Sequence, residues 1–332
     1  MARVFTDGAE FGDTLFWSIQ TGISAATDRV RSGTYSYKRS TNGSMQKNLA
    51  SALSEFYIRA GIQVDGINIT FKLPMWQNGA TELGSIRINQ TTGFVEIYTG
   101  TATLVATGAI SLQADTYYLL EVHVKIDDTV GIIEVKVDGV ADASFSGDTK
   151  PGAATNIDGI FYNGVGTVAF WVDDLALNDT TGGVDDSWCG DGKVALIKAN
   201  ANGDQSDLVG SDADSVDNYL LVDEVPKDDD TTYVEGSVIS GYDLYNLAAT
   251  GLTNVAILRA WPEGRARDTV AEGGLCQLGI KPNGGSEAWS SDISLLTSYT
   301  RIIGTVHTVN PLTTDVWGVS ELDALQAGFK VK

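Results

Sequence analysis

An all-β fold, built as two β-sandwich domains in tandem, is predicted from three features of this 332-residue sequence. Residues 117–140 alternate between apolar and polar side chains, which is the period-2 pattern of a half-buried strand. Short runs of the same kind follow one another along most of the chain. Clusters of Gly, Asn and Asp separate these runs, as tight turns require, and such spacing is typical of a sandwich or barrel.

The stretch from 117 to 140 is the clearest of these runs. From 120 to 126 every second residue is apolar, and the positions between them carry Glu121, His123 and Lys125. The sequence 127–129 predicts a turn, after which the alternation resumes from 133 to 137, and Asp138-Gly139 predicts a second turn. We therefore expect an antiparallel hairpin with one face on a core and a polar face, including His123, that is solvated or contacts a partner.

The remaining strands of the first half are expected at 33–40, 55–64, 68–76, 84–89, 94–100, 103–110, 156–164 and 168–178. The composition then changes, because residues 179–193 contain four Gly and four Asp. Such turn-formers mark a boundary between domains. We therefore predict one domain at 1–180, a linker at 181–193 and a second domain at 194–332.

The second half repeats the strand pattern at 194–204, 217–224, 232–239, 254–261, 274–282, 299–309 and 326–332. One short helix is predicted at 321–328. Ser320 is its expected N-cap, and Glu321 and Asp323 would lie near the positive end of the helix. A second β-sandwich is therefore expected after the first.

The charge of the chain limits its partners. Its net charge is −21, from 43 acidic and 22 basic residues, and the acidic residues are spread along the chain. Nucleic acids and anionic membranes bind clustered Lys and Arg, so neither is expected as a partner. No apolar run approaches the roughly 18 residues needed to cross a bilayer, so we expect a soluble protein without membrane insertion.

Two further features concern the compartment. The first 17 residues contain neither the basic nor the apolar region of an export signal. The two cysteines, Cys189 and Cys276, lie far apart and lack metal-ligand spacing, so both are expected to be free thiols.

Catalytic patterns are missing from the sequence. It has two histidines, His123 and His307, and no HExxH, GxSxG, P-loop or GxGxxG motif. A glycosidase needs two carboxylates that flank the sugar bond, as an ExDxxE strand supplies in some sandwiches. The nearest approach is Glu134 to Asp138, which has the wrong spacing and no third acid. We therefore predict a non-enzymatic protein without catalytic residues.

No cofactor is expected, although acidic clusters could hold calcium. The cluster that begins at Asp228 starts like an EF-hand loop but lacks its glycine and its final glutamate. At Asp173-Asp174, adjacent strand residues face opposite sides, so one carboxylate points inward and needs a partner. Solvated turns are the alternative, and no residue is assigned as a metal ligand. The clusters are Asp173-Asp174, Asp185-Asp186, Asp212 with Asp214 and Asp217, and Asp228 to Asp230.

Sugar binding is predicted where aromatic residues stand beside amides. Trp76 and Asn78 follow one predicted strand, and Tyr162 and Asn163 end another. A ring face can cover a pyranose while amides bind its hydroxyl groups. Packing of the two rings in the core or at its rim is the alternative.

Four segments of the first half resemble the concanavalin A-like (laminin G-like) jelly roll. They are RSGTYSYKR, EFYIRAGIQV, LLEVHVKIDDTVGIIEVKVDG and FWVDDLAL, the last of which would be the closing strand. The resemblance covers residues 1–180 and implies a lectin-like jelly-roll domain.

The end of the chain resembles the C-terminal β-domain of structural proteins in tailed bacteriophages. The similar segments begin YDLYNLAATGLTNVAILRAW and CQLGIKPNGGSEAW. A strand that ends in Asn310-Pro311 follows, then a polar turn to Trp317, the acidic SELDAL segment and a closing strand from Gly328 to Val331. The resemblance covers residues 235–332 and brings no catalytic residue with it.

Together the two resemblances imply a non-enzymatic virion accessory protein, which decorates the head or belongs to the neck, tail or fibre. The lectin-like domain would be displayed for surface contact. A carbohydrate-binding module for a host polysaccharide is the alternative. The implied partners are capsid, neck or tail proteins, further copies of this chain, and a host surface glycan. The implied location is the virion, after synthesis in the host cytoplasm.

Overall fold

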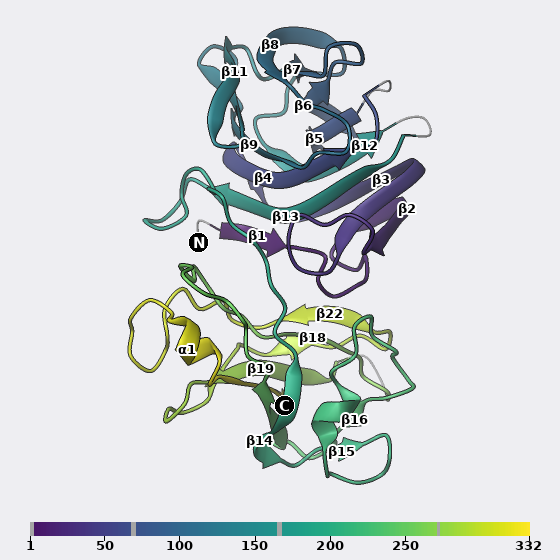
Figure 1. Cartoon of the computed structure of the whole chain (residues 1–332), viewed down its shortest axis with the longest axis vertical. Helices are drawn as coiled ribbons and strands as arrows, with labels where there is room; N and C mark the ends of the chain where they lie inside the picture. Colours follow the sequence, from purple (N-terminus) through teal and green to yellow (C-terminus); the bar gives the residue numbers. More distant parts are fainter. Residues whose placement is uncertain (1–2, 68–70, 165–167, 271–272) are drawn as a thin grey trace. The chain divides into compact units, whose positions relative to one another are not determined.

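The computed structural model describes residues 3–67, 71–164, 168–270 and 273–332 (Figure 1). Their contacts divide the chain into unit 1, Met1–Ala195, and unit 2, Leu196–Lys332. In the described ranges the helices are η1 (Asn218–Leu221) and α1 (Val319–Leu322), four residues each, and strands make up the rest of the regular structure. The predicted all-β class is confirmed.

Unit 1 contains one continuous antiparallel sheet in the order β11-β10-β9-β4-β13-β3-β12-β5-β6-β7-β8, with β1 on β13 and β2 on β3. Its strands are β1 (Arg3–Asp7), β2 (Ile19–Ala26), β3 (Ser36–Leu53), β4 (Glu55–Val64), β5 (Phe71–Asn78), β6 (Thr81–Ile88), β7 (Phe94–Thr99), β8 (Thr103–Ser111), β9 (Tyr118–Lys125), β10 (Gly131–Val137), β11 (Val140–Gly147), β12 (Ile157–Gly164) and β13 (Phe170–Asp179). The first three residues of the strand expected at 68–76 lie outside the described residues.

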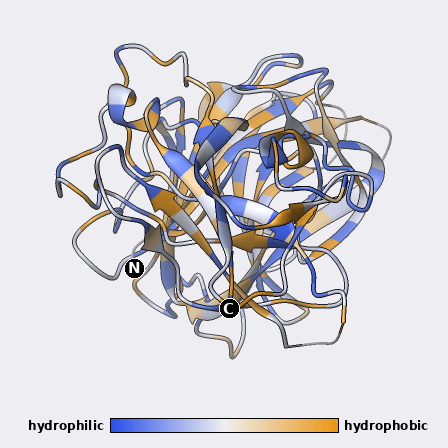
Figure 2. Cartoon of the chain, turned by 90° about the horizontal axis from the view of Figure 1, so that it is seen from below, coloured by the Kyte–Doolittle hydropathy of each residue, from blue (hydrophilic) through white to orange (hydrophobic). Residues whose placement is uncertain are grey.

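The sheet of unit 1 folds over on itself into two layers. Phe56 on β4 meets Trp76 on β5, and Phe71 on β5 meets Phe170 on β13, although neither pair of strands is hydrogen-bonded. The two ends of the sheet, β8 and β11, also lie against each other. Strand β3 joins the layers, since its first residues pair with β13 and its later ones with β12. One large apolar core fills the space between the layers, and apolar and polar residues alternate along the strands (Figure 2).

The predicted hairpin is present as β9 and β10. His123 pairs with Glu134, and Glu121 pairs with Lys136, so these four side chains share the outer face of the sheet. Val122, Val124, Ile133 and Val135 on the other face are in the core. The turn from β10 to β11 uses Asp138 and Gly139, with φ of 50° and 78°, as a two-residue hairpin turn requires.

Unit 2 consists of a larger sheet and two small ones. The larger has the order β14-β17-β23-β19-β20, with β21 also on β19, and the others pair β15 with β16 and β18 with β22. The β18–β22 pair packs on one face of β19, where Ile302 and Leu278 share a small core. The strands are β14 (Ala199–Ser206), β15 (Val209–Gly210), β16 (Val234–Glu235), β17 (Tyr242–Leu247), β18 (Glu263–Ala266), β19 (Leu275–Lys281), β20 (Ala288–Trp289), β21 (Ile293–Ser294), β22 (Thr300–Ile303) and β23 (Gln326–Val331).

Three local predictions for unit 2 are wrong. Residues 218–221 form η1 rather than a strand, because the Asn218 amide is buried and donates to Leu208 O and to Asp243 Oδ2. Within 254–261 the described backbone forms only an isolated bridge from Ala260 to His307. The helix α1 begins after Gly318, whose N–H donates to Glu321 Oε2, and not after Ser320.

Two general properties of the chain follow from the described residues. Cys189 and Cys276 are free and buried. None of the helices in these ranges has the length and apolar character needed to span a membrane.

Candidate functional site

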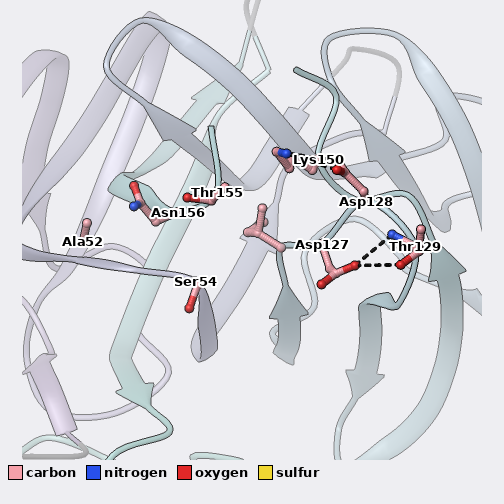
Figure 3. Close-up of a pocket in the computed structure, with 9 residues that line it drawn as sticks. Ala52, Ser54, Asp127, Asp128, Thr129, Lys150, Thr155 and Asn156 are labelled. Carbon is pink, nitrogen blue, oxygen red and sulfur yellow. Dashed lines mark hydrogen bonds and ion pairs between the residues drawn. The ribbon is translucent and has the colours of Figure 1, made fainter. Parts of the chain in front are cut away.

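An open depression of about 650 Å³ lies at one end of unit 1, where three connections meet (Figure 3). Polar side chains dominate its lining, and none of the lining residues is aromatic. They are Ala52, Ser54, Ile126, Asp127, Asp128, Thr129, Lys150, Thr155 and Asn156.

Much of the polar lining is already engaged within the loops. Asp127 Oδ1 accepts hydrogen bonds from the N–H groups of Thr129 and Val130 at 2.8 and 2.9 Å, which close the β9–β10 turn. These backbone donors hold the pKa of Asp127 below its usual range. Lys150 Nζ lies 3.2 Å from the Asp128 carboxylate. The depression therefore offers hydrogen-bonding groups, but its lining has no ring on which a ligand could stack.

A second candidate lies on the outer face of β4, β9 and β10. Its first residue, Glu55, directly follows Ser54 of the depression. It consists of Tyr57, His123, Trp188, Glu55, Glu134 and Lys136, and we call it the outer-face cluster. The rings of Tyr57 and His123 stack with centroids 4.2 Å apart and planes 6° apart. Trp188 stands edge-on to both, with centroids 5.5 Å from Tyr57 and 6.0 Å from His123.

Two carboxylates flank the imidazole of this cluster. His123 Nε2 is 2.9 Å from Glu55 Oε1, and His123 Nδ1 is 2.9 Å from Glu134 Oε2. The imidazole is buried, whereas the side chains of Glu55 and Glu134 keep 30% and 48% of their surface exposed. The ammonium of Lys136 lies 3.7 Å from the centroid of the Trp188 ring. His123 thus orients two exposed carboxylates beside partly exposed aromatic rings.

Strand register brings most of the cluster together. Tyr57 on β4 pairs with His123 on β9, which pairs in turn with Glu134 on β10. Glu55 and Lys136 lie two residues along β4 and β10, so they share the outer face. The alternation in sequence therefore predicts the side on which these residues lie, but the contacts among them depend on a strand order that alternation does not specify.

Trp188 comes from the segment 185–195, which covers part of the outer face. Gly190 N donates to Glu121 at 2.7 Å and Val194 N donates to Asp174 at 2.8 Å. Arg59 donates to Gly190 O and Arg31 donates to Gly192 O, each at 3.1 Å. Because these contacts hold the segment on unit 1, residues 185–193 are not the linker that the sequence predicts.

Because segment 185–195 lies over it, the polar face of the hairpin is less exposed than the sequence predicts. Glu121 and His123 are 4% and 6% exposed, so neither is solvated in the way that the alternation suggests. The pKa of the Tyr57 hydroxyl is raised, first by burial and then by the charges of Glu55, Glu134 and Asp186. Tyr57 therefore remains a hydrogen-bond donor in an acidic surrounding.

The residues predicted to bind sugar do not come together. Trp76 and Tyr162 expose none of their surface and belong to the core of unit 1, so neither ring has a face for a sugar, and this part of the prediction is wrong. Asn78 donates to Asn156 O and Oδ1, at 3.1 and 2.9 Å, beside the depression. Asn163 pairs with Ser44 and Lys72, away from β4, β9 and β10.

Asp173 and Asp174 are both fully buried, but protein donors surround them. Asp173 accepts from the N–H groups of Arg31, Ser32 and Asp174. Asp174 accepts from the Arg31 guanidinium, the Ser32 hydroxyl and Val194 N. The argument for calcium at this pair, a buried carboxylate in need of a partner, therefore loses its basis. No group of three or more His, Cys, Asp or Glu is arranged to hold a metal within the described ranges.

Neither a family model nor a curated protein matches the sequence. A protein of unknown function with a galectin-like fold from Bacillus subtilis matches with 8% identity, over 54% of this chain and 96% of its own, at a TM-score of 0.39. The carbohydrate-binding module CBM66 from Bacillus subtilis matches with 10% identity, over 48% and 97%, at 0.33. The alginate lyase Aly36B matches with 12% identity, over 44% and 82%, at 0.36. Likenesses of this size do not decide the chemistry of this chain.

Proposed function

We propose that unit 1 binds carbohydrate at the outer-face cluster. The observation that carries the proposal is the pair of partly exposed rings, Tyr57 and Trp188, beside two exposed carboxylates. Aromatic rings supply an apolar surface for the C–H faces of a sugar, and carboxylates accept hydrogen bonds from its hydroxyl groups.

Preorganisation supports this site over the depression. His123 contacts both carboxylates, and Tyr57 stacks on His123, so Glu55 and Glu134 are oriented before a ligand arrives. A site whose side chains are already ordered loses less entropy on binding. Binding without turnover is the proposed activity, since the raised pKa of Tyr57 disfavours its use as a base and His123 already engages both carboxylates.

A polysaccharide panel tests the proposal on the intact chain. Trp188→Ala and Tyr57→Ala are each expected to weaken binding about tenfold, the loss of roughly 1.4 kcal/mol of stacking, as measured by calorimetry. The matched controls are Asp128→Asn and Thr155→Ala in the depression, which should bind as the parent does. If only the depression variants lose binding, the site is misplaced. If the parent binds no polysaccharide in the panel, the proposed function is wrong.

We also propose that the chain is an accessory component of a tailed-phage virion. The resemblance of residues 235–332 to phage structural proteins supports this proposal, and a sugar-binding unit 1 would suit contact with a host surface. Antibodies against the protein should label purified particles in electron micrographs. Particles that contain the gene but lack the protein would contradict the proposal.

A further inference from the structure

We propose that the outer-face cluster prefers glycans that carry free amino groups, so that its ligand is a polymer of unacetylated hexosamine. This inference rests on the proposed function and narrows the class of sugar that the same site takes.

An ammonium already occupies one aromatic ring of the cluster. Lys136 Nζ lies 3.7 Å from the centroid of Trp188, well within the range of a cation–π interaction. Trp is the strongest aromatic partner for such a cation. Lys136 therefore occupies this position on the ring in the free chain. A sugar amine carries the same group, so it would replace Lys136 on the ring or bind at the carboxylates beside it.

The carboxylates complete the environment that an ammonium needs. Glu55 and Glu134 approach opposite nitrogens of His123, so they lie on either side of the imidazole. Their exposed surface lets a ligand reach them. Hydrogen bonds between an ammonium and a carboxylate are roughly twice as strong as those between neutral groups. An amine therefore gains more at this site than the acetamide or hydroxyl that would replace it.

Carboxylates outnumber the cationic groups around the cluster, since Glu55, Glu121, Glu134 and Asp186 lie there with Arg59 on β4, Lys125 on β9 and Lys136 on β10. Arg59 is buried and donates to Gly190 O, Lys125 pairs across the strands with Glu55, and Lys136 lies over Trp188. At the Tyr57 hydroxyl, burial is the largest cause of the raised pKa, and the charges that add to it are carboxylates: Glu55, Glu134 and Asp186. Uronates, sialic acids and sulfated sugars would meet repulsion at this surface.

A pair of ligands that differ only in acetylation tests the inference. The intact chain is titrated by calorimetry with a β-1,4-glucosamine oligomer, with its fully N-acetylated counterpart and with an oligouronate of equal length, at a mildly acidic pH where the amines are charged. The glucosamine oligomer is expected to bind at least tenfold more tightly than the acetylated one. The oligouronate should show no binding.

Charge variants separate the site from the general attraction of a cationic polymer to a chain of net charge −21. Glu55→Gln and Glu134→Gln should reduce the preference for the glucosamine oligomer several-fold, because each weakens the glucosamine oligomer more than the acetylated one, whose hydroxyl groups lose only a charged acceptor. Asp115→Asn is the matched control, because it removes an exposed carboxylate at a positive φ of 61°, which Asn tolerates. The preference should survive this substitution.

Each failure has a distinct meaning. Equal or tighter binding of the acetylated oligomer would overturn the preference for amines while leaving carbohydrate binding in place. If Asp115→Asn reduces the preference as much as Glu134→Gln does, the preference for amines arises from net charge. That result would also overturn the inference. If Trp188→Ala leaves glucosamine binding unchanged, the amine binds elsewhere. Absence of binding to all three oligomers and to the wider panel would contradict the proposed function itself.

Discussion

Glu10 shows how one residue links burial to pH. Its carboxylate is 8% exposed and accepts hydrogen bonds from Thr34 N and Tyr35 N. Gly33 lies so close that a Cβ there would stand 2.2 Å from Glu10 Oε1. Burial raises the pKa of Glu10 to about 7, with smaller contributions from Asp174 and Asp7. The folded chain therefore holds a proton at Glu10 that the unfolded chain releases.

This raised pKa predicts a loss of stability as the solution becomes neutral. Between pH 4.5 and about 7 the folded state binds more protons than the unfolded state at this position, so the free energy of unfolding falls as pH rises. Glu10→Gln removes the titration and should flatten the fall. Urea unfolding of parent and variant at the two ends of this range measures the effect.

The result has a built-in comparison. Asp173, whose pKa burial and Asp174 also raise, stays in both proteins and should leave a residual slope in the variant. Equal pH slopes for parent and Glu10→Gln would show that Glu10 does not carry the effect.

At the scale of the element, alternation predicts strands well where one face is apolar. Strand β4 matches the expected 55–64 in full, and β9 and β10 match the predicted hairpin. Strand β2 was not predicted, since its residues are mostly exposed or half-buried and show no apolar face. The pattern does not predict strand β17, because its second residue, Asp243, is a carboxylate that is buried and accepts from partners such as the Leu208 N–H.

The segment 185–195 marks the limit of sequence reasoning for the candidate site. Its Gly and Asp residues predict a linker, yet its backbone groups bind buried side chains of β4, β9 and β13. At Gly192 a Cβ would stand 2.2 Å from Arg59 Nη1, so the glycine permits close approach and not only flexibility. Backbone contacts of this kind leave no periodic trace, so Trp188 could not be placed beside Tyr57 from the sequence.

Aromatic residues illustrate the same limit. Trp76 and Trp188 both stand near polar residues in the sequence, but the first is in the core and the second is partly exposed on the outer face. The residues next to a ring in the sequence do not reveal whether the ring lies on the inner or the outer face of a sheet. That depends on the order of the strands, which the alternation alone does not specify.

Across the whole molecule, the two units differ in how much apolar surface they bury. The core of unit 1 draws on nearly every strand of its sheet. Within the described part of unit 2 there are two separate cores of four buried residues each. Its β15–β16 and β18–β22 sheets have two strands, and such pairs depend on packing for their stability. Since burial of apolar surface is the main favourable contribution to folding, unit 2 should be the less stable.

This difference predicts two unfolding transitions for the intact chain, with unit 2 unfolding first. Leu322→Ala in a unit 2 core should lower only the first transition, and Ile58→Ala in the unit 1 core only the second, each by about 2–5 kcal/mol. Differential scanning calorimetry of the parent and of both variants measures the two transitions separately. If each substitution shifts the whole profile equally, the chain unfolds as one cooperative body, and the prediction that unit 2 unfolds first is wrong.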